Sequence, residues 1–155
     1  EKIRKLILNN KSTFNKNTDL LLYLASRSEN IKHIKKFYKK KIILIDRFVD
    51  STIAYQHYGF GINLNLIKKM NEHLLENIKV NFTFLNIVNQ NNMTKRLKLR
   101  KKLNRYDRFN KSFYKKVQNG YLKVVKKKGY QIIDSNLDIK FNEKLIIKKV
   151  EKLLK

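Results

Sequence analysis

Residues 41–56, Lys-Ile-Ile-Leu-Ile-Asp-Arg-Phe-Val-Asp-Ser-Thr-Ile-Ala-Tyr-Gln, constrain the fold of this chain more than any other stretch. The run at 42–45 is apolar and mostly β-branched, which predicts a strand buried on both faces, and it ends abruptly in Asp46 and Arg47. In open α/β sheets ligands bind beyond the carboxyl ends of the strands, where a carboxylate can face a metal and a guanidinium a phosphate. Ser51 and Thr52 are good helix-start residues. The pattern therefore predicts a strand, a polar turn with a site, and a helix.

Length and composition bound the class of protein. A chain of 155 residues that is 42% hydrophobic is large enough for one domain with one core. It contains no Cys, which excludes a disulfide framework and a thiolate metal site and makes a reducing cytoplasm the natural setting. No apolar run approaches membrane-spanning length, so we expect no membrane partner.

The formal charge of +25 invites a nucleic-acid interpretation, because clustered basic residues neutralise phosphates. However, 30 of the 37 basic residues are Lys, and they occur with 19 Asn spread through the whole chain. This spread favours a general compositional bias over a dedicated nucleic-acid face. Where Lys is the default cation, a position that holds Arg is more apt to need planar, two-pronged hydrogen bonding. The seven such positions are Arg4, Arg27, Arg47, Arg96, Arg100, Arg105 and Arg108.

Hydrophobic periodicity predicts the remaining elements. Helices are expected at about 1–9, 18–37 with Thr18 as N-cap, 51–58, 63–76, 93–102, 111–127 and 143–154, and further strands at 80–88 and 130–133. Strands separated by helices imply βαβ crossovers, hence an α/β fold with a parallel sheet. No repeat or linker divides residues 1–155, so we expect a single domain. Three strands make a thin sheet and the first helix starts without a cap, so we expect the chain to be incomplete at its amino terminus.

Three blocks of sequence resemble one family. Residues 46–56, D-R-F-V-D-S-T-I-A-Y-Q, resemble the D-R-[YFH]-x-x-S-[ST]-x-A-Y-Q signature of thymidylate kinases. Residues 20–27, L-L-L-Y-L-A-S-R, resemble that family's helix with an aromatic residue four before Arg, and residues 95–108, with Phe113 and Tyr121, resemble its lid and following helix. The resemblance spans nearly the whole chain. It implies a three-layer P-loop NTPase fold with a lid at about 93–110. It also implies a homodimeric enzyme of pyrimidine deoxynucleotide biosynthesis that uses Mg²⁺ and transfers the γ-phosphoryl of ATP to dTMP.

The acceptor site can be predicted residue by residue. Tyr23 and Arg27 are one helical turn apart, so a ring and a guanidinium share one face and can stack on and donate to a flat base. By resemblance they hold thymine and its O4, while Arg47 binds the acceptor phosphate, and we expect Arg27 and Arg47 to face one shared site. The other substrate-binding residues implied are Thr52 at the base edge, Tyr55 against the sugar 2′ position and Gln56 near the base. The alternatives are a core Tyr23, an exposed Asp46–Arg47 ion pair, and a Ser51–Thr52 cap without a ligand.

The resemblance also implies catalytic residues. Asp46 would lie near Mg²⁺, through a metal-bound water, and near the acceptor phosphate that Arg47 binds. Arg96, Arg100 and Arg105 lie in the lid-like segment, where guanidiniums can stabilise the charge on the transferring phosphoryl group. We expect Arg100 and Arg105, rather than Arg96, to be catalytic. The alternative is a solvated basic helix.

The sequence departs from the family pattern at three places. No G-x-x-x-x-G-K-[ST] loop occurs in the 155 residues, the R-E-P-G-G segment expected just before Glu1 is absent, and Val80 and Asn86 stand where Pro and Asp are common. Because such a loop cradles the donor phosphates, we expect these 155 residues alone to be inactive. Two other functions stay open, a deoxynucleoside kinase that would activate a 5′-hydroxyl and a basic nucleic-acid-binding module.

Overall fold

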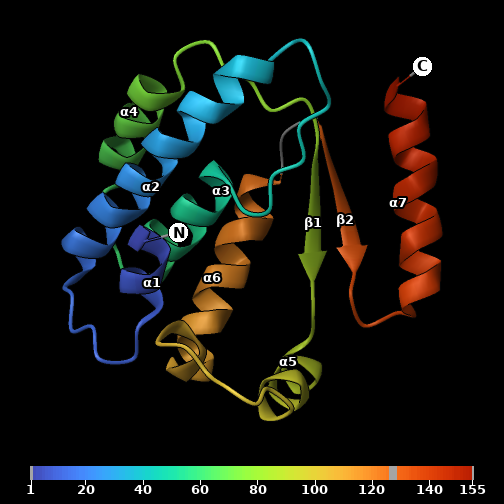
Figure 1. Ribbon diagram of the computed structural model, residues 1–155. Helices are drawn as coiled ribbons and strands as arrows, with labels where there is room; N and C mark the ends of the chain where they lie inside the picture. Colours follow the sequence, from blue (N-terminus) through green and yellow to red (C-terminus); the bar gives the residue numbers. More distant parts are fainter. Residues whose placement is uncertain (1, 126–128, 155) are drawn as a thin grey trace. The chain divides into compact units, whose positions relative to one another are not determined.

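The structure is a computed structural model that describes residues 2–125 and 129–154. The chain forms two compact units (Figure 1). Unit 1 comprises Glu1–Lys79 and Lys102–Val124, and unit 2 comprises Val80–Lys101 and Val125–Lys155. The segment predicted as a lid, at about 93–110, is thus shared between the two units. The single domain expected over residues 1–155 stays a prediction.

Unit 1 is helical. Its elements are α1 (Lys2–Leu8), α2 (Lys16–Phe37), α3 (Val49–Thr52), the π-helix η1 (Ile53–Gly59), α4 (Leu64–Leu75), the 3₁₀ turn η2 (Tyr106–Arg108) and α6 (Lys111–Val124). Leu20 and Leu24 on α2 form a buried core with Ile62 and Ile67, which lie just before and on α4. These apolar side chains recur at helical spacing on α2 and α4, so burying them packs the two helices together.

Two glycines allow η1 and α6 to pack closely. A Cβ at Gly120 would lie 2.6 Å from the Tyr58 ring, and one at Gly59 would lie 2.8 Å from the Phe113 ring. Both distances are below van der Waals contact, so a larger residue would force the helices apart. The backbone of η1 follows i→i+5 hydrogen bonding, as in the 3.0 Å bond from the Phe60 amide to the Tyr55 carbonyl. Such π-turns are rare and frequently mark functional sites.

Unit 2 contains a pair of parallel strands with a helix after each strand. Strand β1 (Thr83–Ile87) pairs with β2 (Tyr130–Asp134) in the register Thr83 to Tyr130 and Ile87 to Asp134. Helix α5 (Gln90–Lys98) follows β1, and α7 (Ile139–Leu154) follows β2 (Figure 1). The parallel strand pair and the α/β class predicted from the sequence are confirmed.

The strand predicted at 42–45 is wrong for this structure. Residues 42–45 have no regular secondary structure, and Ile42 and Leu44 are 67% and 88% exposed. A strand buried on both faces needs neighbouring strands to satisfy its backbone groups. In the parts of the chain that the structure describes, the sheet consists of β1 and β2 paired with each other. Without a partner, the apolar run stays irregular.

Asparagine side chains begin several of the helices. Asn15 Oδ1 accepts hydrogen bonds from the amides of Asn17 and Thr18 at 2.9 and 3.0 Å, so the N-cap of α2 is Asn15 and not the predicted Thr18. Asn63 caps α4 and Asn89 caps α5 through the same kind of bond. Such side chains satisfy amides that have no partner within the helix. Part of the Asn excess therefore has a structural use.

The other predicted helices are confirmed with shifted ends. Helix α3 begins at Val49 instead of residue 51, and α7 begins at Ile139 instead of residue 143 because Asp138 Oδ1 accepts from the Phe141 amide at 3.1 Å. Helix α6 ends at Val124, and residues 126–128, which include its predicted end, lie outside the described residues. Within residues 2–125 and 129–154, no helix is both long and apolar enough to cross a bilayer.

The cap of α2 can be tested by mutation. We expect Asn15→Ala to lower the free energy of unfolding by about 1 kcal/mol, because two amides lose their acceptor. Thr18→Ala, at the cap position expected from the sequence, serves as the matched control and should cost clearly less. Urea denaturation followed by circular dichroism measures both. A larger loss for Thr18→Ala than for Asn15→Ala would contradict the structure.

Candidate functional site

Arg27 is the centre of a buried hydrogen-bond network in unit 1. Its side chain lies on α2 and is 8% exposed. Its Nη2 donates to the Phe48 carbonyl at 2.9 Å and to Thr52 Oγ1 at 2.7 Å, and its Nη1 donates to Asn71 Oδ1 on α4. The guanidinium also lies 5.3 Å from the centroid of the Phe48 ring. One side chain thus connects α2, α4 and the start of α3.

The environment of Arg27 sets its charge state. Burial lowers its pKa to about 10, against the opposing effect of the Asp50 carboxylate. Arg27 therefore remains cationic at neutral pH, and its buried charge is balanced by the hydrogen bonds it donates. Asn71, which is 2% exposed, is itself held because its Nδ2 donates to the Ile67 carbonyl at 2.7 Å. Both Arg27 and its partner Asn71 are therefore held by hydrogen bonds.

Two residues predicted for base binding, Arg27 and Thr52, are bonded directly to each other. Thr52 is 3% exposed and accepts from Arg27 through Oγ1. A threonine hydroxyl that accepts one hydrogen bond can still donate another, and a guanidinium carries five donors. The pair can therefore present polar hydrogens to a ligand while remaining paired. Thr52 also lies within the helical segment that follows the predicted site turn.

Arg47 lies in the turn that precedes α3, the helix that contains Thr52. Its backbone has a φ of 62°, the left-handed region that non-glycine residues adopt at a cost of about 1–3 kcal/mol and that clusters at functional sites. Its guanidinium lies 5.4 Å from the centroid of the Tyr55 ring. Thr52 and Tyr55 are three residues apart on the helical segment, so the partners of Arg27 and Arg47 are near neighbours. Asp46, the predicted metal-proximal residue, is exposed beside Arg47.

The two aromatic residues predicted for the acceptor site, Tyr23 and Tyr55, both contact the ring of Tyr106. Tyr106 packs edge-on against Tyr23 with 6.0 Å between ring centroids and against Tyr55 with 5.8 Å. Burial raises the pKa of Tyr23, so its hydroxyl is neutral at physiological pH. Gln56, on η1 beside Tyr55, is 1% exposed, and its Nε2 has no hydrogen-bond partner among the described residues. A buried amide nitrogen without a partner is unusual and fits a residue that donates to a ligand.

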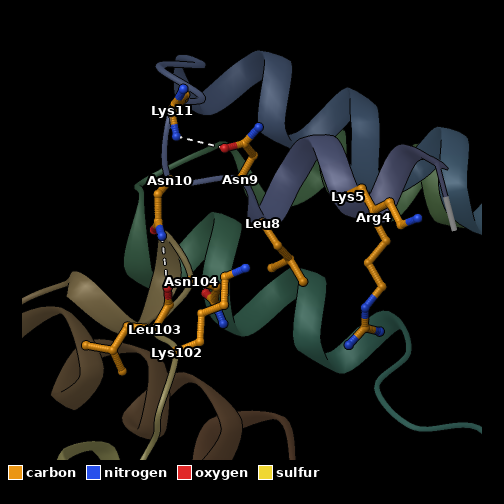
Figure 2. A pocket seen from close by; sticks show the side chains of 9 residues that line it. All are labelled: Arg4, Lys5, Leu8, Asn9, Asn10, Lys11, Lys102, Leu103 and Asn104. Carbon is orange, nitrogen blue, oxygen red and sulfur yellow. Dashed lines mark hydrogen bonds between the residues drawn. The ribbon is translucent and has the colours of Figure 1, made fainter.

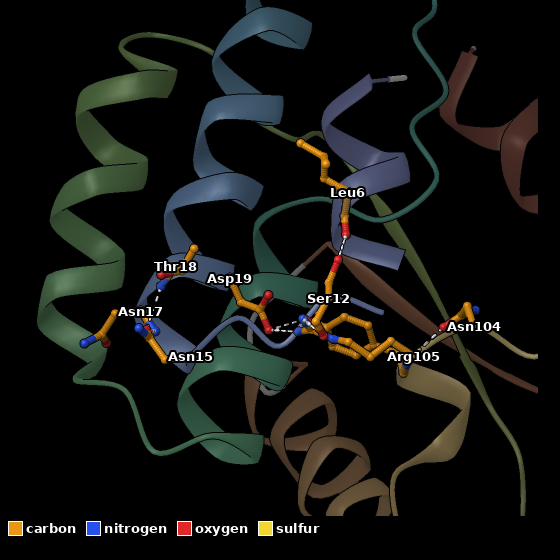
Figure 3. Close-up of polar contacts among 9 residues, drawn as sticks. Leu6, Ser12, Asn15, Asn17, Thr18, Asp19, Asn104 and Arg105 are labelled. Atoms are coloured by element: carbon orange, nitrogen blue, oxygen red, sulfur yellow. Dashed lines mark hydrogen bonds and ion pairs between the residues drawn. The ribbon is translucent and has the colours of Figure 1, made fainter. Parts of the chain in front are cut away.

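The predicted lid arginines are divided between the units. Arg105 lies in unit 1, where its Nη2 donates to Asp19 Oδ2 and its Nη1 donates to the Ser12 carbonyl at 3.4 Å (Figure 3). Arg96 and Arg100 lie in unit 2, on and just after α5, and the Nη2 of Arg96 donates to the Ser135 carbonyl. The catalytic roles predicted for these arginines stay predictions.

Asp19 is a buried charge that the sequence interpretation missed. It is 1% exposed, and its Oδ2 accepts from Arg105 and from the Tyr106 hydroxyl, the latter at 3.2 Å. Burial raises the pKa of Asp19, and the nearby Arg105 and Tyr106 oppose that effect. The available signal was spacing, because Asp19, Tyr23 and Arg27 recur every four residues and so follow one face of α2.

A hollow of about 570 Å³ lies elsewhere in unit 1, between the end of α1 and the segment before η2 (Figure 2). Its lining is basic and polar and includes Arg4, Lys5, Lys11 and Lys102. Asn10 Nδ2 donates to the Leu103 carbonyl at 2.9 Å, which joins its two walls. None of the predicted acceptor residues lines this hollow.

Comparison with known proteins identifies the relatives of this chain. The family model described as thymidylate kinase matches residues 1–146. A thymidylate kinase of Mycoplasma capricolum is 36% identical over 97% of this chain and 76% of its own length, and one of Kosmotoga olearia is 31% identical over 94% and 73%. The crystal structure of thymidylate kinase from Ehrlichia chaffeensis matches with a TM-score of 0.69 and 30% identity over 91% of this chain and 67% of that one. This likeness confirms the predicted α/β P-loop NTPase fold.

The Arg27 network yields a stability prediction. Arg27→Met keeps an apolar stem but leaves Asn71, Thr52 and the Phe48 carbonyl without their donor, so the free energy of unfolding should fall by about 3 kcal/mol. The matched control is Arg4→Met on α1, an exposed position where the change should stay below about 0.5 kcal/mol. Urea denaturation measures both. Equal losses in the two variants would contradict the network.

Proposed function

This chain belongs to the thymidylate kinase family, and we propose that it acts in the transfer of the γ-phosphoryl group of ATP to dTMP, which gives dTDP. The observation that carries this proposal is the link from Arg27 to Thr52 at 2.7 Å. It joins the face of α2 that carries Tyr23 to the turn that carries Arg47, which are the two halves of the acceptor site expected from the sequence. A base-binding face and a phosphate-binding guanidinium are what a nucleoside monophosphate requires.

Each acceptor residue has a role that its chemistry supports. The Tyr23 ring stacks on thymine, Arg27 donates to the base carbonyl at O4, and Thr52 and Gln56 donate to or accept from the base edge. Tyr55 packs against the sugar and favours deoxyribose, which lacks the 2′-hydroxyl. Arg47, whose guanidinium lies over the Tyr55 ring, offers two-pronged hydrogen bonds to the phosphate.

The chemical step needs charge stabilisation more than proton transfer. The acceptor phosphate is largely ionised at neutral pH, so Asp46 need not act as a base and instead orders the groups around the phosphates. Guanidiniums from the lid, with Arg100 and Arg105 favoured over Arg96, stabilise the charge on the transferring group. Arg105 is bonded to Asp19, and because a guanidinium carries five donors it can keep this bond while it donates to a phosphoryl oxygen.

Mg²⁺ fits the residues available at this site. Mg²⁺ in kinases is commonly held by one or two carboxylates, waters and the phosphates of the substrate. Asp46 is an exposed carboxylate beside Arg47, so it could reach the ion through a bound water. When bound, Mg²⁺ would neutralise charge on the phosphates of ATP.

Several further expectations remain part of this proposal. They are a single domain over residues 1–155, a homodimer, a cytoplasmic location, and the absence of a nucleic-acid or membrane partner. The charge of +25 supports attraction of anionic nucleotides as well as it supports binding of nucleic acid. Membership of the thymidylate kinase family favours the nucleotide over the two alternatives, a nucleoside acceptor and a polynucleotide.

Acceptor choice can be tested by calorimetry on this chain. We expect dTMP to bind about 10- to 100-fold more tightly than thymidine, because charge-assisted hydrogen bonds to Arg47 are worth about 1.5–3 kcal/mol. Arg47→Ala should reduce dTMP affinity to that of thymidine, whereas Arg4→Ala should not.

Equal affinity of the unaltered chain for thymidine and dTMP would favour a deoxynucleoside kinase. Salt-dependent DNA binding without nucleotide binding would favour the basic module. An assay of ADP release tests separately whether these 155 residues, which contain no G-x-x-x-x-G-K-[ST] loop, are inactive alone. Robust turnover by the 155 residues would contradict that expectation.

A further inference from the structure

Tyr106 is held in place by its backbone and its hydroxyl. It begins the 3₁₀ turn η2 and is 7% exposed. Its amide donates to Asn104 Oδ1 at 2.8 Å, and its carbonyl accepts from the Tyr114 hydroxyl at 2.6 Å. Its own hydroxyl donates to Asp19 Oδ2 at 3.2 Å. A ring restrained at both its backbone and its tip has little freedom to move.

The ring of Tyr106 lies against both aromatics of the proposed acceptor site. The Tyr23 ring meets it at an interplanar angle of 72° and the Tyr55 ring at 69°. These are edge-to-face contacts, which fix orientation as well as distance because the ring edge is positive and the face negative. Tyr23 comes from α2 and Tyr55 from η1, so Tyr106 sets the spacing between rings on two different elements.

Asp19 explains why Tyr106 keeps this position. A carboxylate that is 1% exposed needs strong partners, and Asp19 finds them in Arg105 and Tyr106, which are adjacent in the chain. Figure 3 shows Asp19 and Arg105 pointing toward one another from α2 and the segment before α6. The Arg105 guanidinium also lies 5.3 Å from the Tyr106 ring centroid. Two consecutive residues are thus anchored on one buried charge.

We propose that Tyr106, anchored by Asp19, is a positioning residue of the acceptor site. Its ring sets the separation of the Tyr23 and Tyr55 rings, and the affinity for the nucleoside part of the acceptor depends on that separation. This inference rests on the proposed function, because it assigns Tyr23 and Tyr55 to the base and the sugar. It also makes the carboxyl-terminal end of the predicted lid, around Tyr106, a fixed wall of the acceptor site.

A double-mutant cycle on dTMP affinity tests this inference. Tyr106→Leu and Tyr23→Leu should each weaken dTMP binding about tenfold, because each loses aromatic contacts that orient the acceptor site. If Tyr106 acts through Tyr23, the double variant should bind dTMP no more than about threefold more weakly than whichever single variant binds dTMP less tightly. The matched control is Tyr38→Leu, whose hydroxyl contacts residues 77 and 79 away from the site and whose loss should leave affinity unchanged.

A milder pair of variants covers a failure of Tyr106→Leu to fold. Tyr106→Phe keeps the ring and removes only the hydroxyl, and Asp19→Asn removes the charge that anchors it. Each should weaken dTMP binding about twofold to fivefold, and the two changes together should do no more than one alone. Circular dichroism confirms that each variant is folded at the temperature of the titration.

The outcomes separate this inference from the proposed function. Losses that multiply in the double variants, or unchanged affinity in Tyr106→Leu, would overturn the positioning role while leaving dTMP binding intact. Failure of the unaltered chain to bind dTMP would overturn the proposed acceptor site and this inference together. Non-additive losses with Tyr23, and none in Tyr38→Leu, would support the role of Tyr106.

Discussion

The buried charge of Arg27 holds three elements of unit 1 together. A guanidinium removed from water must donate its hydrogen bonds to protein groups, and Arg27 finds these on α4, at the Phe48 carbonyl and at Thr52. Satisfying one side chain therefore fixes α2, α4 and the turn before α3 relative to one another. The proposed acceptor site is built on this junction, because Tyr23 precedes Arg27 by one turn and Arg47 precedes Thr52 by five residues. In the proposed site, the same two side chains, Arg27 and Thr52, serve both stability and substrate recognition.

The composition of the chain makes its arginines informative. Lys supplies most of the positive charge, yet the side chains that make directed contacts in the described residues include Arg27, Arg47, Arg96 and Arg105. A planar fork can bond a carbonyl, a carboxylate and a ring face at fixed angles, which an ammonium group does less well. Asn likewise does more than fill the surface, since its side-chain oxygen caps α2, α4 and α5.

The features predictable from the sequence were those set by local pattern. Apolar spacing placed most helices and the strands β1 and β2, and one-turn spacing brought Tyr23 and Arg27 onto one face of α2. The strand expected at 42–45 failed because a buried strand depends on partners that hydrophobicity alone does not reveal. Asp19 was missed because its ion-pair partner, Arg105, is distant in the sequence. Tyr106 could not be found for the same reason, since its neighbours Tyr23 and Tyr55 come from separate elements.

The proposed acceptor site requires that one nucleotide contacts both Arg27 and Arg47. The most direct measurement is a titration of the chain, labelled with ¹⁵N in its arginine side chains, with dTMP followed by NMR. If one nucleotide contacts both residues, the side-chain signals of Arg27 and Arg47 should shift along one saturation curve with a common dissociation constant, while the signal of Arg4 stays in place. Separate saturation curves for Arg27 and Arg47, or shifts confined to Arg4 at the basic hollow, would contradict it.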